Sequence, residues 1–170
     1  MRKSIKATAY HEAGHVVMNI IKRRAFRLAT IDPERLADGV NGCVFGGTIS
    51  EQRKENLRLV QKDIEILFAG GIAEKIYTGR NNNVGARSDR HWAAELIIDH
   101  IPNPKRLDYF IKYLWLGVED ELKKPLNWAS VEAIADYLLE HKTLHSRKAR
   151  LIAREAKARY IKDKMESRKA

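Results

Sequence analysis

The sequence predicts a mainly α-helical domain with one small antiparallel β-sheet, which is the α+β class. Long segments repeat apolar residues at helical spacing, whereas only two short runs, at residues 26–31 and 42–49, have the composition of strands. The chain has 170 residues, of which 44% are hydrophobic and 32% are charged. This size and composition suit one globular domain that buries its own core.

The elements are predicted in order along the chain. The first helix begins after Ser4, an N-cap residue, and runs to about Arg24. The two strand-like runs follow and are expected to pair, with Gly46 and Gly47 weakening or bulging the second strand. Further helices, separated by prolines and polar loops, are expected over residues 51–77, 88–100 and around 107–118, from Asn127 or Ser130 onward, and from residue 146 into the C-terminal tail.

Charge is distributed unevenly. The net charge is +10, and from residue 142 onward 11 Lys or Arg face 3 Asp or Glu, which places +8 in that segment. We therefore expect a folded domain over residues 1–155 and a basic, helical tail over residues 156–170, which is best explained as a solvated helix.

Cysteine content and hydropathy restrict the location of the protein. Cys43 is the single cysteine, which excludes an internal disulfide framework and fits a reducing compartment. No apolar run approaches the ~20 residues of a membrane span, so no transmembrane segment is expected. The sequence thus favours a cytoplasmic protein.

The segment His11-Glu12-Ala13-Gly14-His15 is an H-E-x-x-H motif within the first predicted helix. One helical turn separates the two histidines, so their imidazoles share a face and can bind one Zn²⁺ at about 2.0–2.1 Å each. Glu12 lies about 100° around the helix and can reach a water at the metal without being a ligand. This pattern is typical of metallohydrolases, in which the glutamate takes the proton of the attacking water.

A catalytic zinc takes a third protein ligand and keeps one open position. Two acidic candidates are Glu74, on the predicted helix over residues 51–77, and Asp89, where a loop becomes a helix. Residue chemistry alone leaves both open. Glu74 also fits a solvated helix position, and Asp89 also fits an N-cap or a first-turn acid.

Three further segments follow the motif and add a family resemblance. They read Ala-Gly-Gly-Ile-Ala-Glu-Lys-Ile at residues 69–76, Thr-Gly at 78–79 with Gly-Ala-Arg-Ser-Asp at 85–89, and Leu-Leu-Glu-His-Lys-Thr-Leu at 138–144. With residues 9–15 they resemble, in collinear order over about residues 5–155, the peptidase domain of the FtsH family of ATP-dependent zinc metalloproteases. The chain departs from that family by lacking a G-x-x-x-x-G-K-[ST] phosphate loop and a membrane anchor, and by an asparagine run at 81–83.

The resemblance implies a ligand set. Asp89 would be the third zinc ligand beside His11 and His15, and Glu12 would be the general base. Glu74 would then support the site, where its carboxylate can accept a hydrogen bond from the second nitrogen of a ligating histidine.

The resemblance also implies that an extended peptide pairs with the edge strand at Cys43, Val44 and Phe45. We therefore expect a zinc-dependent endopeptidase that hydrolyses unfolded or flexible polypeptides without its own ATPase, either directly or after delivery by a separate ATPase or adaptor. A homo-oligomer is left open. The alternative is a non-catalytic zinc-binding module that regulates a partner or binds nucleic acid through its basic tail. Glu12 argues against that alternative, because a zinc scaffold needs only its ligands.

Overall fold

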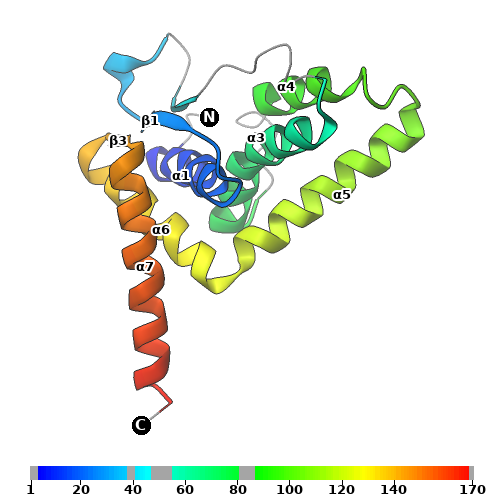
Figure 1. The fold of residues 1–170 in the computed structure, drawn as a ribbon. Helices are drawn as coiled ribbons and strands as arrows, with labels where there is room; N and C mark the ends of the chain where they lie inside the picture. Colours follow the sequence, from blue (N-terminus) through cyan, green and yellow to red (C-terminus); the bar gives the residue numbers. More distant parts are fainter. Residues whose placement is uncertain (1–3, 38–40, 47–54, 81–86, 169–170) are drawn as a thin grey trace.

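The computed structural model describes residues 4–37, 41–46, 55–80 and 87–168. Figure 1 shows the order and arrangement of the elements within these ranges. They are α1 (Ile5–Ile21), β1 (Phe26–Thr30), a 3₁₀ turn (Pro33–Arg35), β2 (Cys43–Gly46), α3 (Leu57–Thr78), α4 (Arg87–Ile97), α5 (Pro104–Lys123), α6 (Pro125–His141), β3 (Thr143–His145) and α7 (Ser146–Glu166). The chain is mainly helical with one small antiparallel sheet, which confirms the predicted α+β class.

The described sheet has the strand order β2-β1-β3, with β1 in the centre and antiparallel to both neighbours. The predicted pairing of residues 26–31 with residues 42–49 is therefore confirmed for β1 and β2, while residues 47–49 lie outside the described residues. Phe26 pairs with Gly46 and Leu28 pairs with Phe45, so Arg27 is an extra residue on β1. A bulge was expected in the second strand, β2. The extra residue instead lies in β1, opposite Gly46.

The third strand was not predicted. β3 has only three residues, too few to show a period-two pattern. Its position is fixed by burial and by backbone geometry: Leu144 is fully buried, and Lys142, just before the strand, has a positive φ of 63° that turns the chain out of α6. The hydroxyls of Thr30 and Thr143 lie 2.9 Å apart and add a side-chain hydrogen bond across β1 and β3.

The second long helix begins later than predicted. The sequence placed its start near Glu51, whereas α3 begins at Leu57; residues 51–54 lie outside the described residues. The reason is the cap, since the side chain of Asn56 accepts hydrogen bonds from the backbone N–H groups of Arg58 and Leu59.

The fifth predicted helix begins earlier than predicted. α6 starts at Pro125, whose fixed φ suits the first turn of a helix, and neither Asn127 nor Ser130 caps it. Instead the amide of Asn127 donates to the backbone carbonyl of Glu121 at 2.9 Å. The hydroxyl of Ser130 donates to the carbonyl of Leu126 inside the helix at 3.0 Å.

α1 is the central helix of the fold and packs against α3, α6 and the sheet. Small residues allow the closest approach, which is between α1 and α3. A Cβ at Gly14 would fall 2.6 Å from the Cβ of Ala73 and closer still to the carbonyl oxygen of Ala69. The face of α1 that carries the histidines is therefore held directly against the backbone of α3.

α7 runs without a break through residues 155 and 156, the boundary expected between domain and tail. Ala149 and Ala153 are buried against the body, whereas residues 161–168 are exposed. In Figure 1 the C-terminal half of α7 extends away from the other elements. None of the described helices combines the length and the apolar character needed to cross a lipid bilayer.

Candidate metal centre

Three side chains from two helices converge beside the middle of α1. His11 and His15 lie one turn apart on α1, and Asp89 lies in the first turn of α4. The Nε2 atoms of His11 and His15 lie 3.1 Å and 3.6 Å from the same oxygen, Oδ2 of Asp89. One potential ligand atom from each residue lies within 4.8 Å of the others, which is compatible with ligands about 2.0–2.2 Å from a single ion.

The helix α3 holds the opposite nitrogens of both imidazoles. Nδ1 of His11 lies 3.1 Å from Oε2 of the buried Glu74, and Nδ1 of His15 donates to the carbonyl oxygen of Ile66 at 2.7 Å. With the Nδ1 proton accepted in this way, Nε2, the atom that faces Asp89, is the nitrogen that would exchange its own proton for a metal ion. Both rings are thereby oriented as metal-ligating histidines usually are, with Glu74 placed behind His11.

Gly70 leaves the space that these rings occupy. A Cβ at this position would fall 2.7 Å from Nε2 of His11 and closer still to Nε2 of His15. A glycine inside a helix costs about 1 kcal/mol relative to alanine. At Gly70 only glycine leaves room for the imidazoles, because any side chain would displace the two histidines.

Asp89 is the anionic member of the group. Burial alone would raise the pKa of its carboxyl, but the charge of His15 and hydrogen bonds from His11 and His15 outweigh burial and hold the pKa well below its usual range. Asp89 is therefore ionised at neutral pH. Two imidazole nitrogens beside one carboxylate oxygen form a donor set that suits Zn²⁺ and other divalent transition metals, so the residues present fit a metal ion.

Glu12 is buried beside this group without belonging to it. The residue is 4% exposed, and a Cβ at Gly42 would lie 2.5 Å from its Oε1. The residue before β2 is thus in close contact with the Glu12 carboxylate. Because Glu12 follows His11 directly, one turn of α1 carries both a candidate ligand and a carboxylate that is outside the ligand group.

The predicted substrate strand begins next to Glu12. Burial, followed by the negative charges of Glu12 and Asp89, raises the pKa of the Cys43 thiol, the first residue of β2. Cys43 and Val44 are half-buried, and Phe45 is 36% exposed. β2 is an outer strand of the described sheet, as the expected peptide-pairing role requires.

Two contacts of the site were missed by the sequence reasoning. The carbonyl of Ile66 is a backbone group and leaves no signal in the sequence. Gly42 was assigned to the strand, although a glycine just before a strand can also mark close approach of a neighbouring group. Gly70, inside α3, lies against both imidazoles.

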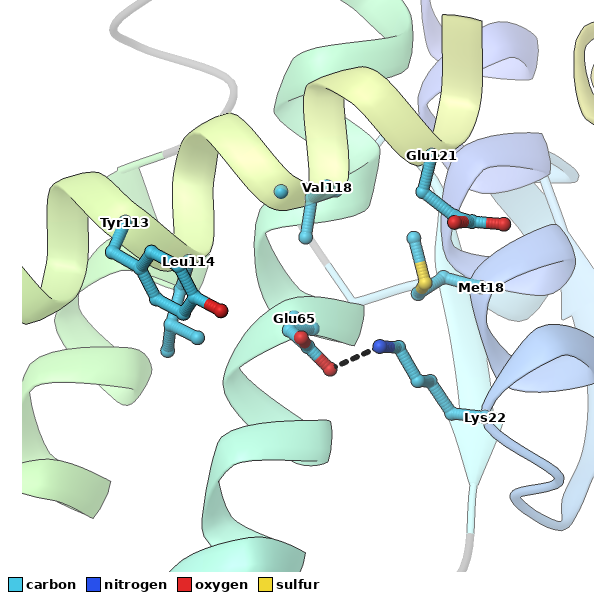
Figure 2. A pocket seen from close by; sticks show the side chains of 8 residues that line it. Met18, Lys22, Glu65, Tyr113, Leu114, Val118 and Glu121 are labelled. Carbon is cyan, nitrogen blue, oxygen red and sulfur yellow. Dashed lines mark ion pairs between the residues drawn. The ribbon is translucent and has the colours of Figure 1, made fainter. Parts of the chain in front are cut away.

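A hollow lies away from these residues, between α1, α3 and α5, and is shown in Figure 2. An ion pair between Lys22 and Glu65, 2.5 Å long, forms part of its lining. Its volume of about 80 Å³ accommodates a few waters rather than a cofactor. The remaining lining residues are Met18, Tyr113, Leu114, Gly117, Val118 and Glu121.

No protein-family model matches the chain, and no curated protein matches it. The case for a metal centre therefore depends on the geometry of His11, His15 and Asp89 and on the two groups that orient the rings.

Proposed function

We propose that the protein is a zinc-dependent endopeptidase, similar to the FtsH peptidase domain and without an ATPase of its own. The strongest support is the position of Glu12, a buried glutamate on the same helical turn as two histidines whose Nε2 atoms face one carboxylate. A metal scaffold needs only ligands, whereas a hydrolase also needs a base beside them.

Each residue then has a distinct role. His11, His15 and Asp89 would hold the zinc, with Glu74 orienting the ring of His11. Bound zinc would supply a Lewis acid that polarises the scissile carbonyl and acidifies a water. Glu12 accepts a proton from the attacking water as its oxygen bonds to the carbonyl carbon. As the C–N bond breaks, Glu12 returns this proton to the leaving nitrogen, giving a carboxylic acid and an amine.

The edge strand suggests which substrates are accepted. An extended polypeptide can add to the outer side of β2 through backbone hydrogen bonds, which places its chain beside Glu12. Pairing of this kind requires a segment that is not already part of a folded sheet or helix. The substrates are therefore unfolded or flexible polypeptides.

Stably folded substrates would have to be unfolded before they could pair with β2. The sequence contains no phosphate-binding loop of the G-x-x-x-x-G-K-[ST] type, so the chain has no such means of coupling ATP hydrolysis to unfolding. A separate ATPase or adaptor would deliver them.

The decisive experiment compares zinc content and casein hydrolysis in wild type and Glu12→Gln. The amide cannot accept the proton of water, so Glu12→Gln should keep its zinc and lose roughly 10²–10⁴ in kcat. Glu132→Gln, the same substitution at an exposed position on α6, is the control and should behave as wild type. Full activity in Glu12→Gln would refute the proposed base, and loss of zinc would make Glu12 a ligand.

Metal content tests the ligand assignment separately. The purified protein should hold about one zinc per chain, the stoichiometry of a mononuclear site. His11→Ala and His15→Ala should each remove it, while His141→Ala, at an exposed histidine on α6, should not. Retention of full zinc in both His11→Ala and His15→Ala would rule out this site.

A second candidate function draws on α7. Its exposed C-terminal half carries Arg159, Lys162 and Lys164, which could contact phosphates without any peptidase activity. Affinity for DNA that falls steeply with salt, in a protein that binds zinc but does not hydrolyse casein, would favour this non-catalytic function over the peptidase.

A further inference from the structure

The outward face of α5 carries a row of exposed apolar side chains, which we call the α5 ridge. Tyr109, Tyr113 and Leu116 are 71%, 68% and 60% exposed. Their spacing of four and three residues places them in one row. Tyr109 and Leu116 lie on the side of the helix opposite the buried Leu114 and Val118, and Tyr113, at the edge of the row, also borders the hollow of Figure 2. Figure 1 shows α5 along one edge of the molecule, where a second protein can reach it. A continuous aromatic and aliphatic row on an outer helix is typical of a protein interface.

We propose that the α5 ridge is the interface of a symmetric dimer, in which two copies of α5 pack antiparallel about a two-fold axis near Tyr113. Charge supplies the first reason. Arg106 and Asp120 are both exposed and lie seven residues before and after Tyr113, so both extend the same row by two helical turns. A two-fold axis at Tyr113 brings Arg106 of each chain opposite Asp120 of the other.

Shape supplies the second reason. Tyr109 and Gly117 lie four residues before and after Tyr113, so the same axis places each Tyr109 ring over Gly117 of the second copy. A Cβ at Gly117 would meet nothing within 4 Å, and the helix surface is therefore open there. A protruding ring opposite an open glycine is the relationship of a knob to a hole in paired helices.

The two relationships select both the partner and its direction. The same two-fold axis pairs Arg106 with Asp120 and Tyr109 with Gly117. Because all four residues belong to this chain, the partner is a second copy of it. A parallel pairing in register would instead bring Arg106 against Arg106 and Asp120 against Asp120, which is unfavourable. Self-association through α5 is independent of whether the metal centre is catalytic.

Sedimentation equilibrium over a concentration series tests the interface in the full chain. Wild type should show a mass that rises with concentration toward two chains. Tyr113→Glu should raise the dimer dissociation constant at least about 30-fold, because it buries two like charges near the axis. Ile161→Glu, at a 48% exposed position on α7, is the matched control and should associate as wild type. A monomeric wild type, or a Tyr113→Glu variant that associates normally, would overturn the proposal.

Charge exchange tests the antiparallel direction. Arg106→Asp and Asp120→Arg should each weaken the dimer roughly tenfold, since each creates two like-charged pairs. The double variant R106D/D120R restores opposite charges across the axis and should regain wild-type association. Arg159→Asp, with the same change in charge on α7, should have no effect. If the double variant associates no better than the single variants, the antiparallel arrangement is wrong.

Discussion

Glu74 and Asp89 contact opposite nitrogens of the same imidazole, that of His11, each through an oxygen 3.1 Å away. The two acids that the sequence offered as alternatives for one role therefore have different positions. Asp89 faces the nitrogens that could bind an ion, and Glu74 lies behind the ring. An imidazole held between two carboxylates has little freedom to rotate, so the nitrogen that could bind an ion is held in place.

Zinc affinity should separate the two carboxylates. Glu74→Gln keeps an oxygen that can accept a hydrogen bond from Nδ1 of His11, but it removes the negative charge. We therefore expect it to weaken zinc binding about 10- to 100-fold. Asp89→Asn removes an anionic ligand oxygen and should weaken binding further. Competition with a chelator of known affinity measures both variants. A larger loss in Glu74→Gln would exchange the roles assigned to the two residues.

Gly70 and Gly117 should respond in opposite ways to alanine. At Gly117, in α5, the methyl group meets open space within the chain, and Gly117→Ala should stabilise the monomer by about 0.5–1 kcal/mol, measured at concentrations too low for the proposed dimer. At Gly70 the same methyl group would overlap both imidazoles, so Gly70→Ala should lose zinc and stability together. Urea unfolding and metal analysis measure the two effects. Equal zinc content in both variants would contradict the position of the rings against Gly70.

Gly42 should be required for activity more than for metal binding. A methyl group there would overlap the Glu12 carboxylate, whereas at Gly46 the nearest atom to a Cβ is the carbonyl oxygen of Ala25 at 3.8 Å, an ordinary contact. Gly42→Ala should therefore keep zinc and lose most casein hydrolysis, while Gly46→Ala keeps both. Normal turnover in Gly42→Ala would indicate that Glu12 can move without affecting the chemistry.

Tyr10 should make stability depend on alkaline pH. Burial, followed by the charges of Glu132 and Asp136, raises the pKa of Tyr10 from its ordinary value of 10.0 to about 12. The folded protein thus keeps the phenol proton where the unfolded chain has released it, and stability falls as pH rises from about 10 to 12. Below that range the contribution is fully present.

The matching experiment is urea unfolding of wild type and Tyr10→Phe across the same pH range. Tyr10→Phe has no phenol proton to lose, so its stability should fall less steeply than that of wild type. Tyr109→Phe, at an exposed tyrosine on α5, is the control. Parallel curves for wild type and Tyr10→Phe would show that Tyr10 titrates alike in the folded and unfolded chains.

The sequence was most informative where a pattern repeats. Apolar periodicity located the helices, and the spacing of His11 and His15 placed two imidazoles on one face, because both follow from helical geometry alone. Helix ends were less predictable. The cap at Asn56 depends on one side-chain conformation, and α6 starts at Pro125 because Asn127 donates to Glu121 and does not cap the helix.

The parts that could not be predicted depend on groups distant in the chain. Periodicity says nothing of whether Glu74 or Asp89 reaches the histidines, since that depends on how α3 and α4 pack against α1. The hydrogen bond from His15 to Ile66 uses a backbone carbonyl, which every residue has. The strand β3 is defined by its pairing with β1 rather than by its own three residues.

That pairing sets when the fold can be completed during synthesis. Leu28 pairs with His145 and Thr30 pairs with Thr143, so the central strand waits for a segment made much later. α1 likewise packs against α6, which directly precedes that segment. A nascent chain on the ribosome can form its first helices, but it cannot close the sheet beside Glu12 until residue 145 has left the exit tunnel. Under the proposed peptidase function, translation itself would thus keep the newly made protein from acting on other unfolded chains until residue 145 has emerged.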